Sequence, residues 1–235
     1  FTDKFSMTAG YMGTFVGYEV IAPTGNFNYS TSYLFTNGPF QNAGVKAEYA
    51  FSDKVSLMVG LFNDWNVYTD PNGLSDFGAQ LYLAPVDGWD VYLNLISGFP
   101  SGTEIDLTTG YQITDAFYLG LNAADWTASG ENAGGFTGVA LYPQVSLSDN
   151  FSLGLRYEYF TFKDMEMAGE DGAPGTTLEG EAYNAVTLSG NIKLGPLTVI
   201  PEVRLDAADQ DVFIDSDAAA AGSAAQALIG VVYGF

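Results

Sequence analysis

The stretch ALIGVVYGF, residues 227–235, alternates between two kinds of position. Apolar or aromatic side chains fall at every second position from Ala227 to Phe235, and two of the four residues between them are glycine. A period of two is typical of a β-strand whose faces meet different surroundings. The same alternation recurs at 55–64 (VSLMVGLFND) and 151–158 (FSLGLRYE), whereas no run has the 3.6-residue period of an amphipathic helix. The sequence therefore predicts an all-β fold.

Alternation and turn residues together predict about 12 strands. We expect them at 3–17, 41–51, 54–66, 76–85, 88–98, 104–113, 116–127, 135–147, 150–163, 182–194, 196–206 and 223–235. Tight turns alternate with longer polar connections at 18–40, 67–75, 99–103, 128–134, 164–181 and 207–222. This arrangement is typical of outer-membrane barrels, with short turns in the periplasm and longer loops outside. We predict one domain, residues 1–235, forming a closed antiparallel transmembrane β-barrel in which the first strand pairs with the last.

The distribution of charge favours a membrane barrel over a soluble barrel or sandwich. Only 15% of the residues are charged, against about 25% in ordinary soluble domains. A soluble barrel would carry many Lys and Glu on its outer face, whereas the polar positions here are mostly Gly, Ser, Thr, Asn, Gln and Tyr. No charge falls mid-strand on the apolar face, as a lipid-facing band requires.

Composition excludes several other classes of protein. The net charge of −21, with 28 acidic and 7 basic residues, argues against a nucleic-acid partner. Without Cys there is neither a disulfide nor thiol chemistry, and without His a Ser-His-Asp mechanism is impossible. We therefore expect no enzyme activity. No apolar window is long enough for a membrane-spanning helix. Because residues 1–10 already read as a strand, we expect a signal peptide to have been removed.

The end of the chain resembles the C-terminal assembly signal of bacterial outer-membrane proteins. The residues that carry the resemblance are Gly230, Tyr233 and Phe235, although Leu228 stands where a polar residue is usual. The resemblance implies recognition by the barrel-assembly machinery. The alternative is an ordinary last strand of a β-sandwich, which would need no terminal aromatic residue.

A longer resemblance covers residues 5–66. Residues 17–35 read GYEVIAPTGNFNYSTSYLF and 36–65 read TNGPFQNAGVKAEYAFSDKVSLMVGLFNDW. This resembles the OmpL-like putative β-barrel porin family, which has a G-Y-E segment, an N-[FW]-N-Y-S-x-S-Y-L-F run, a P-F-x-x-x-G-V strand start and a G-x-x-N-x-W strand end. Asp64 replaces a Gly of the family pattern. The resemblance implies an outer-membrane porin, and because the motif lies well inside family sequences, we expect upstream strands to be missing.

The connection at 18–40 is long for a segment without obvious structure, and such loops are usually functional. The family resemblance implies that it enters the lumen and narrows it. The side chains that would do so are those of Glu19, Tyr29, Ser30, Ser32 and Tyr33. Alternation within 26–35 leaves open a twisted hairpin with an extra strand.

Charged residues within strands are further candidates for lining a pore. Three pairs share the face opposite the large apolar residues: Lys46 and Glu48, Arg156 and Glu158, and Glu202 and Arg204. They could pair across strands and set the field of a channel, or form the salt-bridged interior of a closed barrel. Because the pairs carry no net charge, a cation preference would come from the loops and four acids: Glu19, Asp64, Asp90 and Asp106.

We predict a porin-like channel for passive diffusion of small solutes, with weak cation preference. The alternative is a non-conducting structural barrel, acting as a subunit or anchor in a larger envelope assembly. We expect outer-membrane lipid and lipopolysaccharide as partners, with other envelope proteins as further candidates. No cofactor is expected, although acidic connections at 164–181 and 207–222 leave weak Ca²⁺ or Mg²⁺ binding open.

Overall fold

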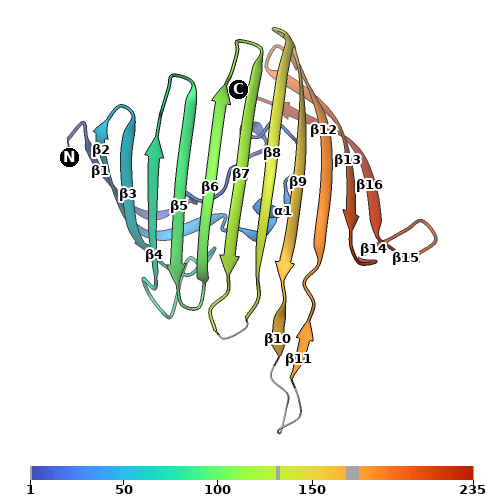
Figure 1. Cartoon of the computed structure of the whole chain (residues 1–235). Coiled ribbons are helices and arrows are strands. Elements are labelled where there is room, and N and C mark those ends of the chain that lie inside the picture. Colours follow the sequence, from blue (N-terminus) through green and yellow to red (C-terminus); the bar gives the residue numbers. More distant parts are fainter. Residues whose placement is uncertain (1, 131–132, 168–174, 235) are drawn as a thin grey trace.

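The computed structural model describes residues 2–130, 133–167 and 175–234. Twelve strands within these ranges form one antiparallel sheet, in the order β1-β2-β3-β4-β5-β6-β7-β8-β9-β12-β13-β16 (Figure 1). They are β1 (Phe5–Gly13), β2 (Gln41–Ser52), β3 (Val55–Phe62), β4 (Asp76–Leu83), β5 (Trp89–Gly98), β6 (Gly102–Gln112), β7 (Phe117–Thr127), β8 (Gly135–Ser148), β9 (Phe151–Lys163), β12 (Ala182–Leu194), β13 (Leu197–Ala208) and β16 (Ser223–Tyr233). The all-β fold and the strand number are confirmed.

Short and long connections lie at opposite ends of the sheet, and Figure 1 shows the short turns at the top. Two long connections carry small hairpins: β10 (Met165–Met167) with β11 (Thr176–Leu178), and β14 (Phe213–Ile214) with β15 (Ala220–Ala221). Between β1 and β2 the chain forms a 3₁₀ turn, η1 (Pro23–Gly25), and a short helix, α1 (Tyr33–Asn37). No helix among the described residues is long and apolar enough to span a membrane.

The predicted pairing of the first strand with the last is wrong. Within the described ranges β1 pairs with β2 and β16 pairs with β13, and no ladder joins β1 to β16. The sheet is curved but open between these two edges. Alternation identifies each strand separately. Closure of a barrel depends on strand number, strand tilt and stagger together. A period of two in the sequence carries no information about tilt or stagger.

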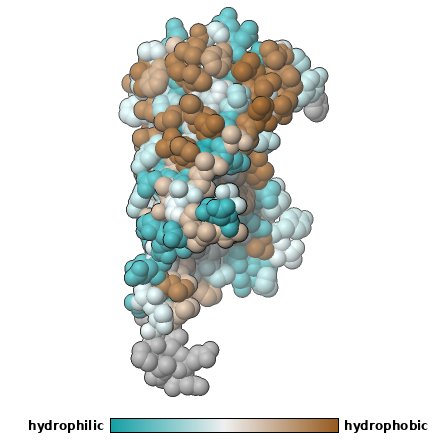
Figure 2. All heavy atoms as spheres, turned by 90° about the vertical axis from the view of Figure 1, so that its right-hand side faces the viewer, coloured by the Kyte–Doolittle hydropathy of each residue, from teal (hydrophilic) through white to brown (hydrophobic). Residues whose placement is uncertain are grey.

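The two faces of the sheet differ as the alternation requires. Along β3, Leu57, Val59 and Leu61 are 37%, 40% and 47% exposed, whereas Met58 and Phe62 on the opposite face are buried. Val231 and Tyr233 are also exposed, and Arg156 and Glu158 are fully buried. On the side of the molecule in Figure 2, hydrophobic residues gather toward the end that carries the short turns. A convex face of exposed large apolar residues suits contact with lipid.

We predict that the convex face tolerates charge poorly, in a depth-dependent way. Val59→Arg places a guanidinium mid-strand and should lower the free energy of unfolding in lipid vesicles by roughly 2–4 kcal/mol. Leu194→Arg, at the turn end of β12, should cost about 0–1 kcal/mol because the cation reaches the interface. Urea titrations followed by tryptophan fluorescence measure both. Equal costs would contradict a lipid-facing band at Val59.

Candidate functional site

Residues 14–40, called the inner segment below, lie against the concave face of the sheet, and Figure 1 shows α1 behind β8 and β9. The segment bonds to strands distant in sequence: the N–H of Gly17 donates to Asp106 Oδ1 at 3.1 Å, and Asn28 Nδ2 donates to Ser189 Oγ at 2.7 Å. Residues 26–35, the alternative extra strand, contain no strand. The run that alternates in sequence instead leads into α1.

The strands of the 12-stranded sheet are called the wall below. Two carboxylates on its concave face accept hydrogen bonds from consecutive backbone amides of the inner segment. Glu202 accepts from the N–H groups of Tyr29 and Ser30 at 2.7 and 3.0 Å. Glu158 accepts from the N–H groups of Tyr33 and Leu34 at 2.9 and 2.8 Å. Hydrogen bonds to an ionised acceptor are roughly twice as strong as neutral ones. These amides thus gain partners that a strand ladder would otherwise supply.

Arg156 is the fully buried cation at the centre of this arrangement. Its Nη1 donates to Glu19 Oε1 at 2.7 Å, and its guanidinium also donates to the carbonyl oxygens of Ser30 and Thr31. Glu19 in turn accepts from both the N–H and the hydroxyl of Ser32, each at 2.7 Å. A buried charge is tolerated only when it is paired and hydrogen-bonded. Glu19 therefore belongs to a neutral buried pair.

The other predicted pore-lining residues have varied surroundings. Arg204 bonds to Asp206 and to the carbonyl of Thr31, Glu48 accepts from Ser56 Oγ, and Lys46 lines a cavity described below. Asp64 lies in the long connection after β3, where it accepts from Ser75 Oγ at 2.8 Å. Neither member of the Arg156–Glu158 pair bonds to the other; both bind the inner segment. Their role in a pore stays a prediction.

Five wall glycines make room for side chains of the inner segment. The pairs are Gly78 with Phe15, Gly120 with Tyr18, Gly154 with Phe27, Gly230 with Tyr29, and Gly138 with Leu34. A Cβ added at Gly78 would lie 2.6 Å from the Phe15 ring, and one at Gly138 would lie 2.8 Å from a Leu34 methyl. Real Cβ atoms do not approach so closely, so each larger residue would displace the segment. Inward glycines mid-strand were the sequence signal that could have identified this contact.

Gly230 therefore has a role that the terminal pattern did not reveal, since it lies under Tyr29. Tyr233 is exposed on the convex face. Phe235, the third residue of the predicted assembly signal, lies outside the described residues. The assembly signal itself stays a prediction.

Around α1 the concave side is packed with aromatic side chains. Leu34 is buried with Phe136, Tyr142 and Phe160, and the Tyr33 ring lies 4.7 Å from that of Tyr183. The Tyr33 hydroxyl donates to Asp206 Oδ1 at 3.0 Å. Burial, and secondly the Asp206 carboxylate, raise the pKa of Tyr33 to about 12. This phenol is therefore neutral at physiological pH.

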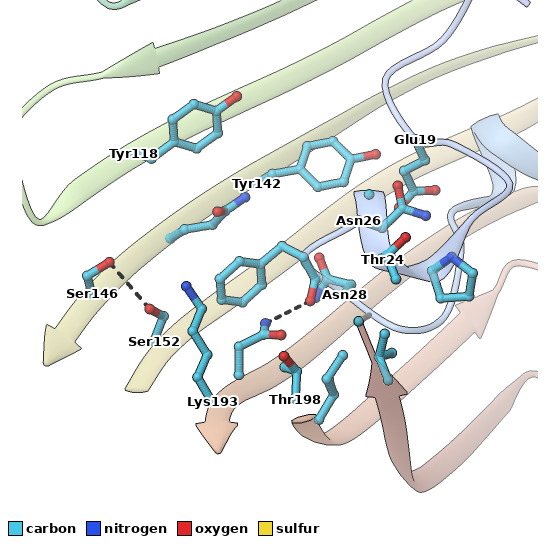
Figure 3. A pocket seen from close by; sticks show the side chains of 18 of the residues that line it. Glu19, Thr24, Asn26, Asn28, Tyr118, Tyr142, Ser146, Ser152, Lys193 and Thr198 are labelled. Atoms are coloured by element: carbon cyan, nitrogen blue, oxygen red, sulfur yellow. Dashed lines mark hydrogen bonds between the residues drawn. The ribbon is translucent and has the colours of Figure 1, made fainter. Parts of the chain in front are cut away.

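Two larger cavities lie on the concave side, toward the short turns. The first, of about 750 Å³, is bounded by residues 23–28 and the inner faces of β8, β9, β12, β13 and β16 (Figure 3). The second, of about 680 Å³, lies against β4 to β7 and includes Lys46 and Asp90. Tyr18 and Tyr118 border both cavities, with hydroxyl oxygens 3.1 Å apart. The inner segment thus divides the polar space inside the sheet.

A third cavity, of about 10 Å³, lies beside α1 and is bordered by Glu104 and Asp106. No group of three or more His, Cys, Asp or Glu among the described residues is arranged to hold a metal ion. Binding of Ca²⁺ or Mg²⁺ at the acidic connections stays a prediction, and part of 164–181 falls in the undescribed range 168–174.

A curved antiparallel sheet with an apolar convex face and polar groups on its concave face is typical of outer-membrane β-barrel proteins. The chain belongs to the family described as "Putative beta-barrel porin-2, OmpL-like", whose profile matches residues 1–235. The predicted family is confirmed, and with it a bacterial outer-membrane location. No curated protein sequence matches the chain.

The solved structure of an outer-membrane protein has a similar fold. OmpT of Vibrio cholerae is 16% identical, with a TM-score of 0.59 over 99% of this chain and 77% of that chain. OprD of Pseudomonas aeruginosa is 14% identical, with a TM-score of 0.48 over 97% and 76%. OccD3 (OpdP) of the same organism is 13% identical, with a TM-score of 0.45 over 97% and 74%. The likeness to OmpT bears on the fold alone.

We predict that the Gly154–Phe27 contact is energetically coupled. Gly154→Ala should lower the free energy of unfolding by about 1–3 kcal/mol, because the added methyl overpacks against Phe27. In a Phe27→Ala background the same change should cost less than 1 kcal/mol, because the ring is gone. Denaturant titration of the four proteins measures the coupling.

The matched control is Gly190→Ala, where an added Cβ would lie 3.3 Å or more from its neighbours. Its cost should be the same with and without Phe27. Additive effects of Gly154→Ala and Phe27→Ala would contradict the proposed close approach.

Proposed function

We propose that the protein is a diffusion channel for small solutes, in which the inner segment narrows the lumen. The observation that carries the proposal is that the inner segment is fixed to the concave face of the wall while space remains beside it. Charged wall residues hold the backbone of the segment, wall glycines admit its side chains, and cavities lined partly by polar groups remain on both sides of it. The absence of His and Cys further favours transport over hydrolysis.

A channel needs a wall without a lateral opening to lipid, because unpaired strand edges are costly there. The edges of β1 and β16 carry no ladder partner on their outer sides within the described ranges. These two strands run antiparallel to each other. We therefore propose that the wall is completed by an even number of additional strands between them.

A second candidate is a non-conducting structural barrel. It is favoured by the region around α1, where Leu34, Phe136 and Phe160 are buried and the adjacent cavity is only about 10 Å³. In that case the concave side would serve to rigidify an envelope anchor. Conductance separates the two functions.

We expect Tyr18→Ala to raise the single-channel conductance in planar bilayers. Removing the ring would join the two cavities that Tyr18 and Tyr118 separate. The control is Tyr49→Ala, an exposed tyrosine, which should leave conductance unchanged. Conductance that is measurable but unchanged by Tyr18→Ala would place the inner segment outside the pathway. Absence of conductance in every variant would support the structural barrel.

We also propose weak cation preference that arises at the long-loop mouth. Glu19 cannot supply it, since its carboxylate is paired with Arg156. Four acids remain in the connection after β13: Asp209, Asp211, Asp215 and Asp217. Negative charge at an entrance raises the local cation concentration, and the effect is screened over about 8 Å at physiological salt.

Replacing these four residues with Asn should reduce the cation-directed reversal potential in a salt gradient, most clearly at low ionic strength. The four matched Asp→Glu changes keep the charge and should leave the reversal potential unchanged. A reversal potential in the Asn variant equal to that of the wild-type protein would contradict a cation preference that arises from these four residues.

Lipopolysaccharide and the barrel-assembly machinery remain proposed partners. The acidic long-loop end supports the first, because divalent cations could bridge its carboxylates to lipid phosphates. The exposed Tyr233 at the end of β16 supports the second.

A further inference from the structure

We propose that the first cavity binds a neutral, hydroxyl-rich solute of the size of a mono- or disaccharide. The inference rests on the proposed channel function, because it names the class of solute that the channel would recognise. The volume of about 750 Å³ falls within the range of small-molecule sites.

Amide and hydroxyl side chains, which can both donate and accept hydrogen bonds, line this cavity beside apolar residues such as Phe27 and Ile200 (Figure 3). The side chains of Thr24, Gln144 and Thr198 make no hydrogen bond to another described residue. Asn191 donates its Nδ2 to the Phe27 carbonyl, which leaves its amide oxygen available. These groups come from both the inner segment and the wall, so a solute with hydroxyls on several sides could be held from opposite directions.

Fixed charge is nearly absent from the same surface. Glu19 is paired with Arg156 at 2.7 Å, and the remaining charged lining residue, Lys193, is an exposed side chain near the turn after β12. An ion entering the cavity would lose hydration without a buried counter-charge to replace it. A neutral solute meets no such cost.

Aromatic rings complete the lining. Tyr118 is half-buried, and Tyr18 lies stacked on Tyr142 with ring centroids 4.3 Å apart. Tyrosine offers an apolar ring beside a polar hydroxyl, and a pyranose has C–H groups on its ring faces and hydroxyls at its edge. Amides, hydroxyls and aromatic rings together match that chemistry. The second cavity differs, because Lys46 and Asp90 place opposite charges on its lining.

The test measures maltose binding to the detergent-purified protein by isothermal titration calorimetry, with arginine and glutamate as charged comparison solutes. We expect saturable heat with maltose and none with the charged solutes. Gln144→Leu removes a free amide of similar size and should raise the Kd for maltose at least fivefold. Gln210→Leu, in the exposed connection after β13, should leave the Kd unchanged.

In planar bilayers, maltose should also interrupt the ionic current of the wild-type protein, with weaker interruption in Gln144→Leu. An open channel without saturable maltose binding would overturn this proposal while the channel function stands. Saturable binding in a protein without conductance would support the site and overturn the channel. A Kd equally affected by Gln144→Leu and Gln210→Leu, or binding of arginine or glutamate in place of maltose, would also overturn the proposal.

Discussion

The rest of the structure depends on the hydrogen bonds between the wall and the backbone of the inner segment, whose amides belong to no strand ladder. The inner segment runs across the concave side of the sheet, where its N–H and C=O groups would be costly if unpaired. Glu158 and Glu202 each accept from two consecutive amides, and Arg156 donates to two carbonyls and to Glu19. Removing one partner of a buried ion pair costs about 3–5 kcal/mol. The Arg156–Glu19 pair therefore holds the inner segment against the wall together with the carboxylate–amide bonds. The path of the segment follows from where the wall carries charge.

The inner segment also fits the wall sterically. Wall glycines lie opposite the bulky side chains of the segment, so that Phe15 approaches Gly78 and Leu34 approaches Gly138. Small wall residues thus set the depth to which the segment enters, and the charged residues set its register along the wall. The cavities on either side are what remains after both conditions are met.

Much of the wall could be predicted from the sequence, because strand alternation is a local property. The alternation at 55–64 predicts that Leu57 and Val59 share one face of a strand, and both are exposed on the convex face. The partners of Arg156 could not be predicted in the same way: Glu19 lies 137 residues away, and an inward-facing charge gives no sign of which distant group it meets. The contact of Gly230 with Tyr29 could not be predicted for the same reason, because the two residues are far apart in sequence. Closure failed for a related reason, because a repeating pattern does not state how many repeats complete a ring.

The contacts of the inner segment also constrain the order of folding. Its residues follow the first strand, yet their partners lie on β6, β9, β12 and β13, and Tyr29 is separated from Glu202 by 173 residues. Contacts of such long sequence separation form slowly, because the intervening chain must first be ordered. The segment can therefore dock only after the later hairpins have curled into place. The inner segment precedes the strands that it contacts, yet it becomes one of the last elements to be fixed, and it then links β1 and β2 to β9, β12 and β13.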